Sequence, residues 1–517
     1  MKARIANFLN DTDLATKNDL KVILITTAII SLFLSFSQVL VDPVINSDGI
    51  LYVQAGSFIQ NNEWALASKL YNWLFYPYIL ANISTLFSIS LEHSAYVVNA
   101  FFSAITCVSF VLIVKEFGGK NKAILCFSSV IILCFPNLNE YRNMVIRDHG
   151  YWAFYLLGCY FFIRAYKKPS VKTLTFLISS LTLASLFRVE GGFFLLTLPL
   201  LLLFRHLSTL KKSSLLVILI IAVTLVGIFT YSDTYQTINV SGFTKTKQLE
   251  RAILAPVTKI SSALNITETY INKLSPQGFS NDYSATVLSF IFILILFTEI
   301  FSATSPLYAI TLSFALFKSK GVLKHPLIRP WIYLVSINII ILCGFLVSRY
   351  FIAGRYPIAL ALTLIIPLPF LAQWVYQKYQ HKNISSKENK LSKVTATLFI
   401  ILSIDGLVST GASKEYLKDA GQWVASSTKE QKGTIFTNNQ FVSFYAGNQK
   451  GKRIKEPNFD TLLHKIKKGK LKEFDILAIQ INRKNLDEKP ILLDTLLMKP
   501  IKIFENNKGD SVLVFKQ

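Results

Sequence analysis

Long apolar stretches alternate with short polar and basic segments along most of the chain. An α-helix needs about 20 apolar residues to cross the hydrocarbon core of a bilayer, so these stretches predict membrane-spanning helices. The pattern predicts about eleven spans, at residues 22–41, 95–114, 123–136, 151–163, 174–187, 193–204, 215–231, 285–317, 331–348, 357–376 and 394–408.

The stretch 285–317 is too long for one straight span and contains Glu299 and Pro306. It predicts a tilted or broken helix, or a span followed by an interfacial helix. Residues 62–79, in the first polar connection, are rich in aromatic side chains. They predict one amphipathic helix at the membrane interface, with Trp64, Tyr71, Trp73 and Tyr76 at headgroup level.

The C-terminal segment differs from the rest because short β-type runs alternate there with helix-like stretches. This pattern predicts a small soluble α/β domain. We therefore expect a polytopic α-helical membrane protein in three parts. These are a cytoplasmic segment 1–21, a membrane domain 22–411 with outside loops 42–94, 137–149 and 232–284, and a soluble domain 412–517.

Basic residues gather in the alternate connections between spans. Counted from a cytoplasmic N-terminus, one side of the membrane receives all five basic clusters, at 115–122, 164–172, 205–212, 318–329 and 378–393. Since Lys and Arg are retained in cytoplasmic loops, the N-terminus is expected in the cytoplasm and the C-terminal domain outside. The Lys/Asn/Ile-rich composition and the absence of cysteine from the C-terminal domain favour a bacterial inner membrane, with that domain in the periplasm.

Composition agrees with this assignment, since 52% of residues are hydrophobic, 16% are charged and the mean hydropathy is +0.44. Loop lysines and arginines explain the net charge of +24 without a nucleic-acid partner. All five cysteines lie in apolar stretches, so no disulfide framework is expected. The sequence contains no CxxC, HExxH or P-loop motif, and its six histidines lack metal-ligand spacing.

Asp48, which follows the first span in the stretch VDPVINSDGILYVQAGSF, is the first candidate for chemistry. A carboxylate at the mouth of a span is partly desolvated, and it could act as a general base or hold a divalent cation. The alternative is a loop aspartate beside Gly49 that forms an Asx turn. Asp42, which precedes Pro43, is interpreted as a turn or helix-end residue.

Asp148 is the second candidate, in YRNMVIRDHGYW at the expected outside mouth of the span at 151–163. Two carboxylates at one membrane face suit an acid/base pair or a metal site, and Asp48 and Asp148 are the expected ligands of any Mg²⁺ or Mn²⁺ ion. Asp148 is also suitable as the N-cap of the following helix.

Arginines at the outside ends of spans are the third group of candidate site residues, because guanidinium groups bind phosphate in a bidentate manner. Five arginines lie at these ends: Arg142, Arg147, Arg188, Arg349 and Arg355. The last four are the expected phosphate ligands, and Lys245, Lys247 and Arg251 of the loop at 232–284 could contribute. The alternative is local pairing, of Arg188 with Glu190 and of Arg147 with Asp148. Tyr52, His149 and Glu190 are further site candidates.

Four stretches together resemble the GT-C glycosyltransferases, of the protein-mannosyltransferase and lipid-A aminoarabinose-transferase type. They are SDGILYVQAGSFIQN, IRDHGYWAFYLLGCYFFIRAYKK, LFRVEGGFFLLTLPLLLLF and SRYFIAGRYPIALALTLIIPLPFL. The resemblance covers most of residues 22–410. It implies that Asp48 is the first-loop catalytic carboxylate, that Asp148 is the second acidic residue, and that Arg349 and Arg355 meet the carrier phosphate.

The resemblance also implies a polyprenyl-phosphate-linked sugar donor and a glycan, lipid or protein acceptor. Asp48 would take the acceptor proton while the bond from sugar to phosphate breaks, with inversion at the anomeric carbon. Two departures concern the acceptor. Asp48–Gly49 stands where protein mannosyltransferases have an Asp–Glu pair, and the absence of a WWD motif argues against asparagine-linked transfer.

Other functions stay open on the residues alone. A transporter or flippase for a lipid-linked sugar would use the same arginines but also requires polar groups inside spans, where Glu299 and Asp405 are the main examples. An envelope-polysaccharide ligase or polymerase would use the long loop at 232–284. A third possibility is an assembly protein whose soluble tail binds a partner.

Overall fold

The structure is a computed structural model. It describes residues 14–206, 259–271, 283–318, 328–380, 413–429, 434–447 and 459–517, together with single positions between 273 and 401. The chain divides into two compact units, each of which is described by itself. The first comprises Met1–Ser35, Asn99–Arg142 and Arg147–Leu407, and the second comprises Phe36–Val98, Asn143–Ile146 and Val408–Gln517.

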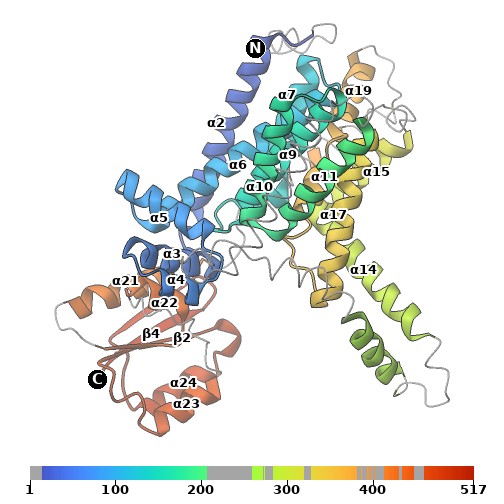
Figure 1. Cartoon of the computed structure of the whole chain (residues 1–517). Helices are drawn as coiled ribbons and strands as arrows, with labels where there is room; N and C mark the ends of the chain where they lie inside the picture. The colour runs from blue at the N-terminus through green and yellow to red at the C-terminus, as the bar shows by residue number, and fades with distance from the viewer. Residues whose placement is uncertain are drawn as a thin grey trace. The chain divides into compact units, whose positions relative to one another are not determined.

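Helices make up most of the described chain (Figure 1). Two of them, α2 (Lys17–Val41) and α6 (Leu91–Glu116), contribute residues to both units. The first unit also contains α7 (Lys122–Leu133), α8 (Pro136–Glu140), α9 (Asp148–Lys167), α10 (Val171–Phe187), α11 (Val189–His206), α14 (Ser284–Thr304), α15 (Pro306–Lys318), α17 (Ile328–Arg349), α18 (Ile358–Leu364) and α19 (Leu368–Gln380).

Six of the described helices are long and apolar enough to cross a membrane. They are α2, α6, α11, α14, α17 and the apolar segment Ile358–Gln377 formed by α18 and α19. The shorter helices α7 and α10 are also apolar. The prediction of a polytopic helical membrane protein is therefore confirmed. The expected span at 215–231 and most of the one at 394–408 lie outside the described residues.

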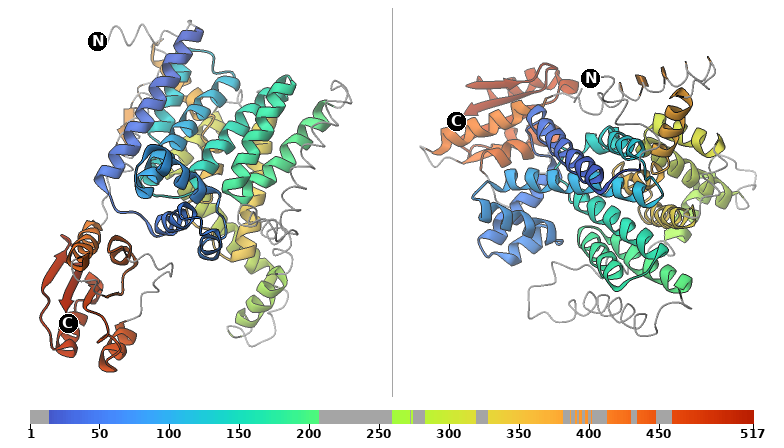
Figure 2. Two further views of the ribbon diagram at one scale, coloured as in Figure 1. Left: turned by 60° about the vertical axis from the view of Figure 1, so that its left-hand side comes forward. Right: turned by 90° about the horizontal axis from the view of Figure 1, so that it is seen from above.

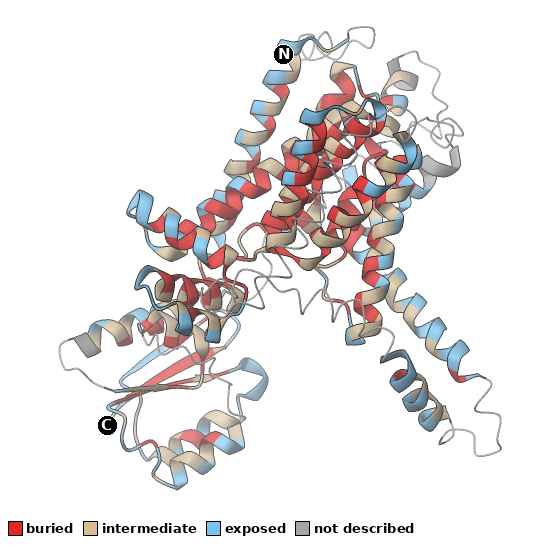
Figure 3. Cartoon of the chain, in the orientation of Figure 1, coloured by how far each residue is buried: buried red, intermediate tan, exposed pale blue. Residues whose placement is uncertain are grey.

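Burial along α2 is the reverse of that on a water-soluble helix. Thr27, Ser31 and Ser35 are buried, whereas Ile29 and Phe33 are 60% and 69% exposed. The hydroxyl groups of Thr27 and Ser129 lie 2.7 Å apart. Most of α14 is likewise exposed although it is apolar (Figure 3). Exposed apolar faces of this size are expected where lipid is the solvent.

The long apolar stretch at 285–317 is a broken helix, which is one of the predicted alternatives. Helix α14 ends at Thr304, and α15 begins at Pro306. Ser305 between them has a φ of +65°, outside the right-handed helical region. Proline disfavours the helical conformation in the residue before it and lacks a backbone N–H, which explains the break at this position.

The second unit contains α3 (Ser47–Gln60), α4 (Trp64–Leu70) and α5 (Phe75–Phe87). The single amphipathic helix predicted at 62–79 is wrong, since Tyr71 is extended and separates α4 from α5. Tyr52 of α3 packs against this aromatic segment. The centre of its ring lies 5.1 Å from the ring centres of Tyr71 and Tyr76, in edge-on contacts. Trp73 and Tyr76 are buried in the unit rather than exposed at an interface.

The C-terminal segment forms the predicted α/β fold, and its sheet has four strands. The strands are β1 (Ile435–Thr437), β2 (Ile476–Ile481), β3 (Lys502–Glu505) and β4 (Ser511–Lys516), and their order in the sheet is β1-β2-β4-β3. Strand β1 is parallel to β2, whereas β4 is antiparallel to both β2 and β3. The helices of this segment are α21 (Glu415–Lys429), α22 (Gln440–Tyr445), α23 (Phe459–Lys467), α24 (Glu488–Leu496) and the 3₁₀ turn η2 (Arg483–Asn485).

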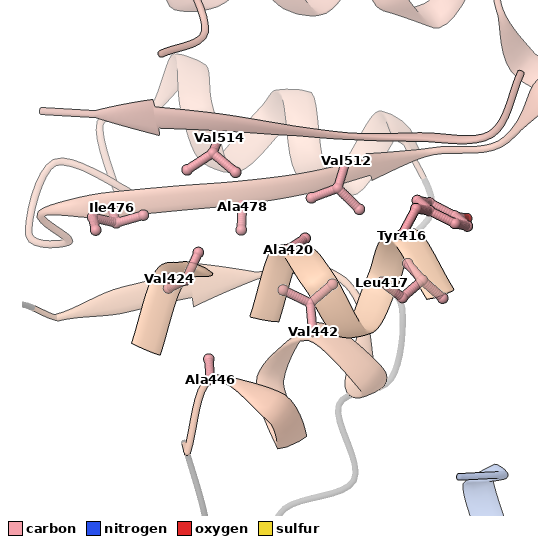
Figure 4. Close-up of a cluster of buried hydrophobic side chains, with 10 residues drawn as sticks. All are labelled: Tyr416, Leu417, Ala420, Val424, Val442, Ala446, Ile476, Ala478, Val512 and Val514. Carbon is pink, nitrogen blue, oxygen red and sulfur yellow. The ribbon is translucent and has the colours of Figure 1, made fainter. Parts of the chain in front are cut away.

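The two faces of this sheet bury alternate residues of the same strands. Ile476 and Ala478 of β2 pack with residues of α21 and α22 (Figure 4). Leu477 and Ile479 pack on the other side, with residues that include Leu462 of α23 and Leu492 of α24. Because both faces are covered, β2 and β4 are apolar almost throughout, which explains their continuous hydrophobic runs.

Candidate active site

An arginine held between two buried carboxylates forms the polar centre of the first unit. Arg188 lies in the link between α10 and α11. Its Nη1 pairs with Asp148 Oδ1, its Nη2 pairs with Glu190 Oε1, and its Nε donates to Glu190 Oε1 at 2.8 Å. All three side chains are less than a tenth exposed. Each of these buried charges therefore has a partner of opposite sign, as buried charges require.

Close helix packing brings these groups together. Helices α9, α10 and α11 lie side by side (Figure 2). A Cβ added at Gly150 would collide with the ring of Phe187, and one added at Gly191 would collide with the backbone of Ser185. Glycine is thus needed where α9 and α11 approach α10. These two glycines follow Asp148 and Glu190 closely in the chain, so the contacts fix where both carboxylates lie.

Two further arginines lie at the more exposed edge of this cluster. The Nε of Arg355 is 4.0 Å from Asp148 Oδ2, and its side chain is 28% exposed. Arg349 is exposed, and its Nη1 donates to the Tyr356 hydroxyl at 2.9 Å. The Tyr356 ring lies 4.4 Å from the Arg188 guanidinium carbon. Arg188, Arg349 and Arg355 with Asp148 and Glu190 carry a formal net charge of +1, and Arg349 and Arg355 are the more accessible arginines of this set.

Tyr141 borders the same group of residues. Its hydroxyl oxygen would lie 3.4 Å from a Cβ added at Gly354, next to Arg355. Burial, assisted by the negative charge of Glu140, raises the pKa of Tyr141 to about 12. The phenol therefore stays protonated near neutral pH and can donate a hydrogen bond. Neither Tyr141 nor Tyr356 was expected from the sequence; the only signal for Tyr356 is its position directly after Arg355.

One expected local pairing is confirmed, since Arg188 pairs with Glu190. Asp148 forms ion pairs with Arg188 and Arg355, and the positive charge of Arg147 also acts on it. Arg147 is half-buried at the N-cap position of α9. Asp148 is the first helical residue, one position beyond the predicted cap, where its charge still favours the positive helix end.

Two residues expected near the outside face are buried among neutral partners instead. Both ring nitrogens of His149 have partners, since Nδ1 is 3.2 Å from Ser103 Oγ and Nε2 is 2.9 Å from the Tyr141 carbonyl. Arg142 is about 1% exposed and donates to the side chains of Ser31 and Ser35 at 3.0 and 2.9 Å. The expectation that Arg142 faces a phosphate at the surface is therefore wrong.

Asp48 belongs to the second unit and lies in the first turn of α3, where it is half-buried. It is thus a helical residue, not the predicted loop aspartate. A Cβ added at the adjacent Gly49 would lie 2.6 Å from Ile45 Cγ1 and 2.8 Å from Val145 Cβ. The side-chain oxygen of Asn46 accepts a hydrogen bond from the Val145 N–H at 2.7 Å. These contacts fix the beginning of α3. Asp42 follows the last residue of α2, as expected.

Among the described residues, no group of three or more His, Cys, Asp or Glu side chains is arranged to hold a metal ion. Asp148 already contacts two guanidinium groups. A cation bound at Asp148 would have to compete with Arg188 and Arg355 for its oxygens.

Comparison with known proteins gives a partial family match. Residues 74–231 match the dolichyl-phosphate-mannose-protein mannosyltransferase family. The matched segment contains Asp148, Arg188 and Glu190, whereas Asp48 and Arg355 lie outside it. The match confirms the resemblance to the GT-C enzymes. The matched segment covers less than a third of the 517 residues.

The solved structures similar to this chain include two of ArnT from Cupriavidus metallidurans. The one bound to undecaprenyl phosphate has 12% sequence identity and a TM-score of 0.40, over 96% of this chain and 98% of that one. The structure in the apo state has 11% identity and a TM-score of 0.37, over 95% and 97% of the two chains. Among curated proteins, none matches this sequence.

Proposed function

We propose that this enzyme transfers a sugar from a polyprenyl-phosphate carrier to an acceptor at the periplasmic face of a bacterial inner membrane. The observation that carries the proposal is the cationic edge formed by Arg349 and Arg355 beside the buried Asp148–Arg188 pair, in a chain that matches a family of lipid-phosphate-sugar-dependent transferases. The basic connections between spans support a cytoplasmic N-terminus.

In this proposal Arg349 and Arg355 bind the carrier phosphate. Guanidinium groups stay charged beside lipid, and they stabilise the negative charge that the phosphate gains when its bond to the sugar breaks. Arg188 is already paired with two carboxylates. Its role, and that of Asp148, is to orient the cationic edge and to keep the total charge of the site near neutral.

Asp48 acts as the general base. It accepts the proton of the acceptor hydroxyl or amine as the acceptor oxygen or nitrogen bonds to the anomeric carbon. The electron pair of the breaking C–O bond stays on the carrier phosphate, so atoms and charge balance without a redox partner. One displacement of this kind inverts the anomeric centre. The sugar is a hexose or pentose, and the acceptor a glycan, lipid or protein.

The test is Asp48→Asn in purified enzyme in lipid nanodiscs, with Asp42→Asn as the matched control. Undecaprenyl-phosphate-mannose and undecaprenyl-phosphate-aminoarabinose serve as donors, and acceptor-dependent release of undecaprenyl phosphate is the signal. Loss of a general base is expected to lower kcat by about 10²–10⁴-fold. Asp42→Asn should stay within about twofold. Wild-type rates in folded Asp48→Asn would remove the catalytic role from Asp48.

A further inference from the structure

The hydroxyl group of Tyr445 connects three segments of the second unit. Tyr445 is the last residue of α22 in the C-terminal α/β fold. Its Oη accepts a hydrogen bond from the Ile45 N–H at 3.1 Å and donates one to Glu92 Oε1 at 2.9 Å. The segment between α2 and α3 and the first turn of α6 are thus joined through one phenol. Burial raises the pKa of Tyr445, so this donor stays protonated.

A second residue of the α/β fold contacts the same segment. The Nζ of Lys418 in α21 donates to the Pro43 carbonyl at 3.2 Å and lies 5.4 Å from the centre of the Tyr445 ring. The backbone of Tyr445 is itself closely held, because a Cβ added at Gly421 of α21 would lie 2.6 Å from Tyr445 Cβ. The α/β fold therefore presents a rigid pair of contacts to residues 43–45.

These contacts lie immediately before Asp48. Ile45 is fully buried, so its N–H has no access to water as a substitute acceptor. The Asn46 carbonyl accepts the Ile50 N–H at 3.0 Å, which makes Ile45 and Asn46 the entry to α3. The close approach of Gly49 to Val145 leaves no space for α3 to shift while keeping its packing. A displacement at Ile45 is therefore transmitted to the first turn of α3, and with it to Asp48.

We propose that Tyr445 is a positioning residue for Asp48, through which the C-terminal α/β fold sets the geometry of the catalytic carboxylate. The catalytic part of this inference rests on the proposed function. Its structural part, that the phenol holds the entry to α3, stands without it. Two measurements separate the parts.

The structural part is tested by hydrogen–deuterium exchange of the full-length protein in nanodiscs. Tyr445→Phe removes the acceptor of the Ile45 N–H and is expected to speed exchange in peptides covering residues 43–52 by about fivefold. The matched control is Tyr416→Phe, in the core of the same fold (Figure 4). The Tyr416 hydroxyl accepts a hydrogen bond from Gln480 Nε2 at 2.9 Å. Equal exchange at residues 43–52 in the two variants would overturn the inference.

The catalytic part is tested with the same donors and release assay. Because a misplacement of about 1 Å can cost as much as 10²-fold in rate, Tyr445→Phe is expected to lower kcat about tenfold. The donor KM should stay within about twofold, and Tyr416→Phe should resemble wild type. In Asp48→Asn, adding Tyr445→Phe should change nothing further, because both act through one group.

A Tyr445→Phe enzyme with wild-type kcat, or a loss of equal size in Tyr416→Phe, would overturn the positioning role. If Tyr445→Phe does not yield folded protein, Lys418→Met removes the hydrogen bond to the Pro43 carbonyl and leaves the phenol in place. That variant should also show faster exchange at residues 43–52 and a lower kcat, with smaller changes than Tyr445→Phe. Exchange and kcat equal to those of the wild type would overturn the inference. Failure of the proposed function appears differently, as full activity in Asp48→Asn.

Discussion

Replacing Arg188 with methionine tests whether the buried charge cluster is balanced as its geometry indicates. Methionine keeps an unbranched apolar side chain beside the ring of Tyr356 but removes the cation between Asp148 and Glu190. Removing one partner of a buried ion pair typically costs about 3–5 kcal/mol, because the other charge stays buried. Arg355, at 4.0 Å from Asp148, compensates only one of the two carboxylates. We therefore expect a loss near about 4 kcal/mol.

The assay is thermal melting of the purified protein, followed by intrinsic fluorescence. A loss of this size corresponds to a fall in melting temperature on the order of 5–10 °C. Arg205→Met is the control, since Arg205 lies in the last turn of α11, the helix that follows Arg188, is exposed, and lies over the ring of Tyr166. A surface substitution of this kind should change stability by no more than about 0.5 kcal/mol.

The origin of the loss is tested by neutralising the carboxylates. Adding Asp148→Asn and Glu190→Gln to Arg188→Met removes the unpaired charges and should recover part of the lost stability. The reasoning is refuted if Arg188→Met melts like Arg205→Met. It is also refuted if the neutralised triple variant is no more stable than Arg188→Met alone.

Two further predictions concern the second unit. Gly49→Ala places a Cβ 2.8 Å from Val145 Cβ and should lower the free energy of unfolding by about 1–3 kcal/mol through overpacking. In the control Gly344→Ala the added Cβ meets no atom within 4 Å, so its melting temperature should be unchanged or higher. Equal melting temperatures of the two variants would contradict this prediction. The Thr434 backbone N–H donates to Asp475 at 2.6 Å and lowers the pKa of that carboxyl below its usual 3.8. The ionised carboxylate therefore stabilises the folded state above about pH 4, and this stabilisation is lost as the pH falls through the lowered pKa. Asp475→Asn should reduce the melting temperature of the α/β fold at pH 7 more than at pH 3. A reduction that is the same at both pH values would refute this prediction.

The elements of the fold could be predicted because each leaves a local pattern in the sequence. Apolar length identifies α2, α6 and α17, and Pro306 marks the break after α14. Residues 62–79 were misjudged because aromatic side chains suit both a membrane interface and a packed core. Nothing local shows that Tyr52 lies between Tyr71 and Tyr76.

The candidate site was predictable in its residue types but not in its pairing. Arg188 and Glu190 are two positions apart, so their contact could be anticipated from the chain alone. The pairing of Asp148 with Arg188 depends on the packing of α9 against α10, which is decided by Gly150 and Phe187. Arg142 was misjudged because the partners that bury it lie on α2, about a hundred residues earlier.

That separation along the chain has a consequence for biogenesis. Ser31 enters the bilayer with the first helix, whereas Arg142 is synthesised 111 residues later. Until then the hydroxyls of Ser31 and Ser35 lack the guanidinium group that donates to them in the folded protein. Final docking of the first helix is therefore a late step of co-translational assembly, and a nascent chain released before Arg142 lacks the group that fastens its leading helix to the bundle.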